Sequence, residues 1–106
     1  MPRKQIDYSK TVMYKIVCKD KSVKDMYVGS TTAFANRKYN HKHRCYNKEN
    51  SKHHLELYKT IRRNGHWENW NMILIEKYPC ADKLEQAKRE IYWGNKLHAN
   101  LNMISP

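Results

Sequence analysis

Arg37 and His41 are the first candidates for chemistry, because helical spacing places both on the apolar side of one predicted helix. Over residues 33–46, a rotation of about 100° per residue gathers four side chains within one arc of about 80°. They are Phe34, Arg37, His41 and Cys45. Burying an arginine without an anionic partner is costly. We therefore expect an anion at Arg37, either a carboxylate of this chain or a ligand; the alternative for both polar residues is that they extend past the core into solvent.

Glu90 is the complementary case on the last predicted helix, which Asp82 can cap and which runs to about Leu97. A carboxylate within an apolar arc must be paired, neutralised or bound to a metal, because desolvation disfavours its charged form. Glu90 therefore either pairs with Arg37 or holds a divalent cation beside a cationic phosphate clamp. The apolar residues on the two sides of Glu90 are Leu84, Ala87 and Ile91, then Trp93 and Leu97.

Other reactive combinations find less support. His41, His43, Cys45, His53 and His54 are potential zinc donors, but they form neither a Cys-x-x-Cys pair nor a His-x3–5-His pair on one helical face. There is no Gly-rich phosphate loop and no Gly-x-Ser-x-Gly motif, so nucleotide hydrolysis and serine chemistry are not indicated. Cys45, four residues after His41, is interpreted as a buried structural thiol.

The charge of the chain indicates a polyanionic partner. Its 106 residues carry 21 Lys and Arg against 10 Asp and Glu, a formal net charge of +11. The cations are spread among Tyr, Trp, Asn and His, a pattern typical of phosphate-backbone binding and not of a membrane-surface helix. No run approaches the roughly 20 apolar residues that a bilayer requires.

The cysteines and the first residues favour an intracellular location, in cytoplasm or nucleus. Cys18, Cys45 and Cys80 are widely spaced and odd in number, which argues against a disulfide framework. Residues 1–9 show no secretory signal.

The elements that must position these residues follow from hydrophobic periodicity. It predicts an α+β fold in the order β-β-α-α-β-α, with a small three-stranded antiparallel sheet flanked by helices. No linker or repeat divides the chain, so we expect a single domain over residues 1–106 with its core at about 11–102. The predicted elements span residues 11–18, 26–29, 33–46, 53–63, 70–77 and 82–97.

Two faces of these elements are expected to be buried. A period of two places Val12, Tyr14, Ile16 and Cys18 on one face of the first strand. The second helix carries an apolar side and ends at a glycine signal. The residues of that side are Leu55, Tyr58 and Ile61, and the signal is Asn64-Gly65.

Taken in order, six short motifs resemble the GIY-YIG nuclease domain over about residues 11–102. The resemblance is closest to the catalytic modules of phage homing endonucleases and related proteins of viruses and mobile elements. The first motif departs from the family name, because Val12 and Met13 replace Gly and Ile and only Tyr14 remains. The motifs are Val12-Met13-Tyr14, Tyr27-Val28-Gly29, Arg37-x3-His41, Asn64-Gly65, Glu90 before Tyr92-Trp93, and Leu101-Asn102.

The resemblance implies roles for five residues. Tyr14 and Tyr27 would meet on neighbouring strands, one helping to position or deprotonate the attacking water. A phenol needs a cation, a metal or His41 nearby to act as a base at neutral pH. Arg37 would contact the scissile phosphate, and Glu90 would hold one divalent cation.

Further residues are implied less directly. A polar residue after the Tyr-x-Gly motif and an asparagine near the end of the domain contribute to substrate binding in the family, and here they correspond to Ser30 and Asn102. Some relatives use an additional histidine, which His53 or His54 would supply.

The resulting hypothesis is an endonuclease that hydrolyses DNA phosphodiesters through activated water, with one Mg²⁺ that Mn²⁺ can replace. The alternative is an inactive basic DNA-binding module that retains the nuclease fold. A toxin-like or regulatory interaction protein has no positive feature in the sequence. With no recognition helix evident, a separate DNA-targeting domain or a homodimer would supply specificity and the second cut.

Overall fold

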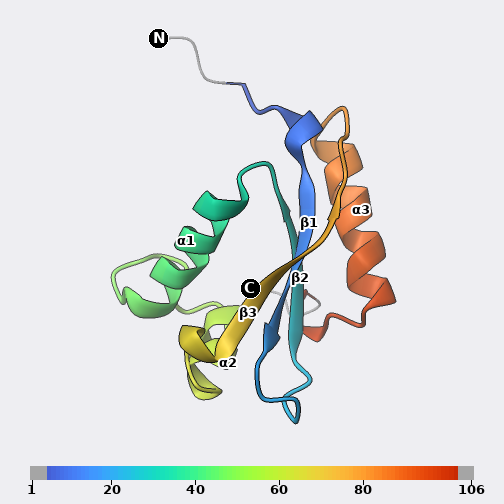
Figure 1. Cartoon of the computed structure of the whole chain (residues 1–106). Helices are drawn as coiled ribbons and strands as arrows, with labels where there is room; N and C mark the ends of the chain where they lie inside the picture. Colours follow the sequence, from blue (N-terminus) through green and yellow to red (C-terminus); the bar gives the residue numbers. More distant parts are fainter. Residues whose placement is uncertain (1–4, 103–106) are drawn as a thin grey trace.

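Three strands form one antiparallel sheet in the order β2-β1-β3, in a computed structural model that describes residues 5–102. The ends of the single domain expected over residues 1–106 lie outside the described residues. The α+β fold and its order of elements are confirmed (Figure 1). The strands are β1 (Val12–Cys18), β2 (Met26–Thr31) and β3 (Trp70–Lys77); the helices are α1 (Phe34–Tyr46), α2 (Glu56–Arg63) and α3 (Lys83–Lys96); the 3-10 turns are η1 (Tyr8–Lys10), η2 (Trp67–Asn69) and η3 (Asn100–Asn102).

The hydrophobic core lies between the sheet and the first two helices. Figure 1 shows α1 and α2 on one side of the sheet and α3 on the other. His41 and Cys45 are the buried residues of α1, and Arg37 is half-buried, so the inward face expected of this helix is confirmed. None of the helices within residues 5–102 is long and apolar enough to cross a bilayer. The core cluster comprises Tyr14, Ile16, Cys18, Cys45, Leu57, Tyr58, Ile61, Trp67, Trp70, Met72 and Leu101.

Consecutive residues of β1 are buried because both faces of the sheet are covered by helices. Met13 and Tyr14 are both fully buried, but only Tyr14 belongs to the core cluster. The expectation that Val12 is buried together with Tyr14 is wrong, since Val12 is only half-buried. The register between β1 and β3 shifts beside these residues: Met13 pairs with Glu76 and Tyr14 with Leu74, so the extra residue of this bulge, Ile75, lies in β3. Tyr14, Ile16 and Cys18 keep the expected orientation toward the core.

The chain between α1 and α2 folds as consecutive turns, so α2 begins at Glu56 and not near residue 53. Asn47 and Asn50 each accept a hydrogen bond from the backbone N–H two residues ahead, at 2.9 Å in both cases. Such side-chain turns compete with helix formation. At its other end α2 stops as expected, at Asn64, and Gly65 follows with a φ of 91°.

The third helix α3 covers the β2 side of the sheet without burying an apolar face. Leu84 and Ile91 are 63% and 62% exposed, and no α3 residue is buried. The expectation that Glu90 lies within a buried apolar arc is therefore wrong; its side chain is half-buried. A narrow sheet of three strands covers only one side of the helix that packs on it.

Polar and cation–π contacts attach α3 to β3. The guanidinium of Arg89 donates to both carboxylate oxygens of Glu76, at 2.5 and 3.0 Å, and Trp93 Nε1 donates to the same carboxylate at 2.8 Å. The Arg89 guanidinium also lies 4.4 Å from the ring centroid of Tyr92 and 5.0 Å from that of Tyr78. A bidentate pair fixes orientation as well as distance, so these contacts set the rotation of α3 about its axis.

The last turn, η3, runs along the free edge of β2. Asn102 Oδ1 accepts from the backbone N–H of Val28 at 2.7 Å, and Asn102 Nδ2 donates to the Val28 carbonyl at 2.6 Å. Asn100 Oδ1 similarly accepts from the N–H of Met26 at 2.9 Å. Two side-chain amides thus satisfy the backbone groups that an edge strand would leave unpaired.

We expect Asn102→Ala to lower the free energy of unfolding by about 1–3 kcal/mol, because both Val28 backbone groups lose their partner. Urea denaturation of the purified protein measures this change. Asn95→Ala, at an exposed position of α3, is the matched control and should shift stability by less than about 0.5 kcal/mol. Equal effects of the two substitutions would contradict the edge-pairing role of Asn102.

Candidate active site

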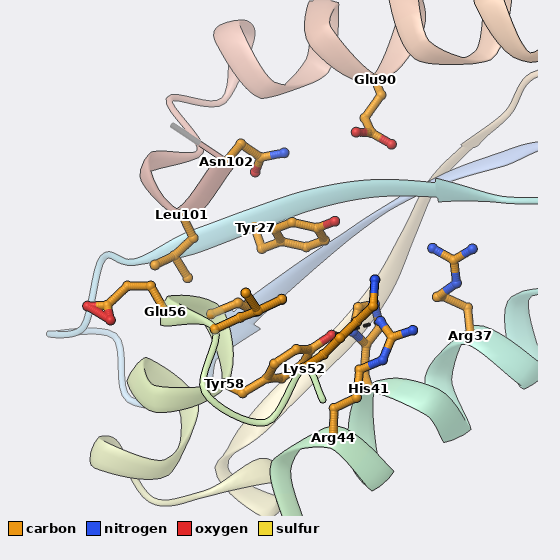
Figure 2. Close-up of a pocket in the computed structure, with 12 residues that line it drawn as sticks. Tyr27, Arg37, His41, Arg44, Lys52, Glu56, Tyr58, Glu90, Leu101 and Asn102 are labelled. Carbon is orange, nitrogen blue, oxygen red and sulfur yellow. Dashed lines mark hydrogen bonds between the residues drawn. The ribbon is translucent and has the colours of Figure 1, made fainter. Parts of the chain in front are cut away.

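A cleft of about 450 Å³ opens between α1, the chain leading into α2, β2, α3 and η3. Five of the residues expected at a reaction site line it: Tyr27, Arg37, His41, Glu90 and Asn102. Figure 2 shows Glu90 reaching in from α3 and Arg37 from α1, with the Tyr27 ring between these two elements. The other lining residues are Arg44, Lys52, Leu55, Glu56, Leu57, Tyr58 and Leu101.

Tyr14 lies beneath this cleft, fully buried, with its ring against Gly29. A Cβ at position 29 would lie 2.5 Å from Tyr14 Cζ, so only glycine leaves room for the ring. The two residues face each other across β1 and β2. The Tyr14 and Tyr27 ring centroids are 6.4 Å apart, so the expected meeting of the two tyrosines is observed.

A chain of hydrogen bonds connects Tyr14 to α2. His41 Nε2 lies 2.8 Å from the Tyr14 hydroxyl, and His41 Nδ1 lies 2.8 Å from the hydroxyl of Tyr58. Arg44 Nη1 donates to the same Tyr58 hydroxyl at 3.1 Å. Tyr58 and Arg44 were absent from the residues expected at the site. The sequence contained one indication of the role of Tyr58: a tyrosine on the buried side of a helix needs a hydrogen-bond partner for its hydroxyl.

Burial controls the protonation of these groups. It lowers the pKa of His41 to about 3, with Arg44 and Arg37 acting in the same direction. It also raises the pKa of Tyr27 to about 12, assisted by the negative charge of Glu90. The pKa of Tyr14 is raised as well, chiefly by burial, while Arg37 opposes that shift. At neutral pH the imidazole is therefore neutral and both phenols carry their protons.

Arg37 and Glu90 face the same cleft without forming an ion pair. Within residues 5–102 the ion pairs are Arg63–Glu56 and Arg89–Glu76. Glu90 Oε1 instead accepts a hydrogen bond from Ser30 Oγ at 2.6 Å. The interpretation in which Glu90 simply neutralises Arg37 is therefore not observed, and both charges remain directed at whatever enters the cleft.

The donor set at Glu90 suits a hard cation that keeps most of its water. Within the described part of the chain, no three His, Cys, Asp or Glu side chains come together as a metal cage. A single carboxylate, supplemented by water and substrate oxygens, is coordination typical of Mg²⁺. The hydrogen bond from Ser30 engages only Oε1 of Glu90. It therefore orients the carboxylate and leaves Oε2 free of Ser30 to bind a cation.

The remaining expected residues occupy different positions. The Asn102 side chain lines the cleft, but both its amide oxygen and its amide nitrogen are engaged in hydrogen bonds with the backbone of Val28. His53 Nδ1 lies 2.8 Å from the carbonyl oxygen of Arg44, and His54 is exposed. Neither histidine lines the cleft, whereas Lys52 of the same segment does.

Comparison with known proteins gives one match. A family model described as the GIY-YIG catalytic domain matches residues 10–102. No curated protein and no solved structure matches the chain.

We expect the burial of neutral His41 to make stability depend on pH. The unfolded chain takes up a proton at this residue below about pH 6.5, whereas the folded protein resists protonation down to a pKa of about 3. Stability should therefore fall as the pH drops from 6.5 toward 3, by up to about 1.4 kcal/mol per pH unit.

Urea denaturation between pH 7 and pH 4.5, compared with His41→Gln, isolates this contribution. The stability advantage of the unmodified protein over the variant should shrink as the pH falls. His98→Gln, at an exposed position, is the control variant. Parallel pH profiles for the unmodified protein and His41→Gln would mean that His41 is not held neutral.

Proposed function

On the premise that the chain belongs to the GIY-YIG catalytic domain family, we propose that it is a Mg²⁺-dependent endonuclease that hydrolyses DNA phosphodiester bonds. The family implies endonuclease activity in general. One observation supports the proposal for this particular chain. Arg37 and Glu90 line the same cleft and carry opposite charges, yet they form no ion pair with each other, and the buried Tyr14 and His41 lie beneath them.

In this proposal Arg37 binds the scissile phosphate. Its planar guanidinium matches phosphate oxygens and stabilises the charge that grows on them in the transition state. Arg44 and Lys52, further along the same cleft, add positive potential for the neighbouring backbone. The other cations of the chain attract DNA through diffuse, salt-sensitive contacts.

Glu90 would hold one Mg²⁺, with Mn²⁺ as a substitute. When bound, the ion supplies Lewis-acid polarisation of a phosphate oxygen and a lowered pKa of a bound water. Ser30 fixes the rotamer of Glu90 through their 2.6 Å hydrogen bond. Ser30 and Asn102 therefore serve substrate binding indirectly, the first through Glu90 and the second through the strand that carries Tyr27.

Tyr27 and Tyr14 would position the attacking water. Tyr27 reaches the cleft directly, while Tyr14 acts from below with its hydroxyl held by His41. Both phenols are protonated in the unliganded protein, so proton removal from water requires that positive charge in the cleft lower their pKa values. Arg37 already acts in this direction on both tyrosines.

The same cleft limits what one copy can do. It presents one Arg37 and one Glu90, so cutting both strands of a duplex needs two encounters or a second copy. We propose that sequence specificity comes from a separate DNA-targeting domain or from dimerisation.

We expect purified protein to nick supercoiled plasmid with Mg²⁺ or Mn²⁺ and to stop when a chelator is added. Arg37→Ala and Glu90→Gln should each lower the cleavage rate by about 10²–10³-fold. DNA affinity should change little in Arg37→Ala, since one of 21 cationic residues is lost.

Lys42→Ala is the matched control, because Lys42 is an exposed cation on the same helix. It should cleave at nearly the unmodified rate. Tight, salt-sensitive DNA binding without cleavage in any divalent metal would instead support the inactive DNA-binding module.

A further inference from the structure

We propose that a second hollow, which adjoins the cleft at Arg37, binds the DNA phosphate next to the scissile one through Arg37 and Lys83. This adjoining hollow has a volume of about 230 Å³ and lies between η1, the end of β2 and the start of α3. The inference rests on the proposed function, because it names where the cleaved strand continues beyond Arg37. The lining includes Ile6, Tyr8, Ser30, Thr32, Arg37 and Lys83.

The adjoining hollow and the cleft meet at Arg37, which lines both. Ser30, whose hydroxyl donates to Glu90 in the cleft, also lines the adjoining hollow. Figure 1 shows α3 beginning at the end of the sheet where β1 starts, and β2 ends there too because the two strands are antiparallel. A phosphate bound by Arg37 would therefore lie at the boundary of two hollows, with the strand leaving it in both directions.

The charge of the adjoining hollow is purely positive. Among the described residues its lining has no acidic side chain, and its charged members are Arg37 and Lys83. In the cleft, by contrast, two carboxylates accompany the cations. Within residues 5–102 neither Arg37 nor Lys83 belongs to an ion pair. A hollow that presents cations without opposing charge attracts a polyanionic strand.

The uncharged part of the lining fits the phosphate and sugar of a nucleotide. Thr31 Oγ1 accepts from the N–H of Ala33 at 3.0 Å, whereas the hydroxyl of the half-buried Thr32 forms no hydrogen bond within the described residues. A threonine hydroxyl is a common donor to phosphate oxygens. Ile6, which is 59% exposed, and the ring of Tyr8 give the hollow an apolar wall against which a deoxyribose can pack.

Together the two hollows define a path for the cleaved strand. Thr32 immediately precedes α1, whereas Arg44 of the cleft lies near the end of that helix. The cations of the path are thus placed on both sides of Arg37. Each phosphate of a strand carries one charge, so contacts on both sides hold the scissile phosphate against sliding. Such positioning raises the rate of attack, and Lys83 should therefore support cleavage without touching a reacting atom.

Cleavage of DNA duplexes that carry a single methylphosphonate tests the proposal, because this substitution removes the charge of one phosphate and the cut site identifies its neighbours. With unmodified protein and Mg²⁺, a methylphosphonate next to the scissile bond should slow cleavage about tenfold. Lys83→Ala should cleave the all-phosphate duplex about tenfold more slowly. On one of the two sides, the methylphosphonate should then slow Lys83→Ala no further, since the contact is already lost.

Two variants control for the loss of a positive charge. Lys88→Ala removes an exposed lysine of the same helix that lines neither hollow, and it should behave as the unmodified protein does. Lys83→Arg keeps the charge and should retain most of the cleavage rate. If methylphosphonates on both sides slow Lys83→Ala as strongly as they slow the unmodified protein, the proposal is wrong.

The salt dependence of DNA binding separates this proposal from the proposed function, because it needs no cleavage. Lys83→Ala should reduce the slope of log affinity against log salt concentration by about 1, relative to both the unmodified protein and Lys88→Ala. An unchanged slope in Lys83→Ala would overturn the phosphate site whether or not the protein cleaves DNA. A reduced slope in a protein that cleaves no DNA would contradict the proposed function and not the phosphate site.

Discussion

The close approach of Tyr14 to Gly29 is the constraint on which the site depends. Adjacent strands place the two residues opposite each other, and the missing side chain at position 29 is the space that the Tyr14 ring fills. Once the ring lies there, its hydroxyl reaches His41, and His41 in turn reaches Tyr58. A strand pair and two helices are thereby joined at one buried point.

The molecule separates neutral, fully buried groups from charged groups that line the cleft. The column of Tyr14, His41 and Tyr58 is uncharged at neutral pH because burial penalises its ionised forms. The cleft above it holds Arg37 and Glu90, whose charges stay available because each lacks the other as an ion-pair partner. The orientation of Glu90 depends in turn on α3, which Glu76 fixes through Arg89 and Trp93. The buried column thus supplies rigidity, and the cleft supplies charge.

Periodicity predicted most of the elements, and the motifs predicted the family. The strand at Trp70–Lys77 and the helices near residues 33–46 and 82–97 were found within about one residue, since their patterns are long and regular. The placement of Arg37 and His41 followed from the same helical spacing. Glu90 was singled out because it was expected within a buried apolar arc of its helix, and that arc is not buried. Spacing alone does not reveal how much of a helix the sheet covers. Tyr58 and Lys52 were missed because their contacts depend on how α1 and α2 pack, which no local pattern encodes.

Single-turnover cleavage by Gly29→Ala tests the central claim most directly, with DNA affinity and the thermal unfolding midpoint measured on the same samples. A methyl group at Gly29 must displace the Tyr14 ring, whereas Gly94→Ala adds one where nothing lies within 4 Å. The account predicts that Gly29→Ala, assayed below its unfolding temperature, loses about 10²-fold or more in cleavage rate while binding DNA as before. Gly94→Ala should retain both properties. Unimpaired cleavage by folded Gly29→Ala would contradict the dependence of the reaction on the buried column.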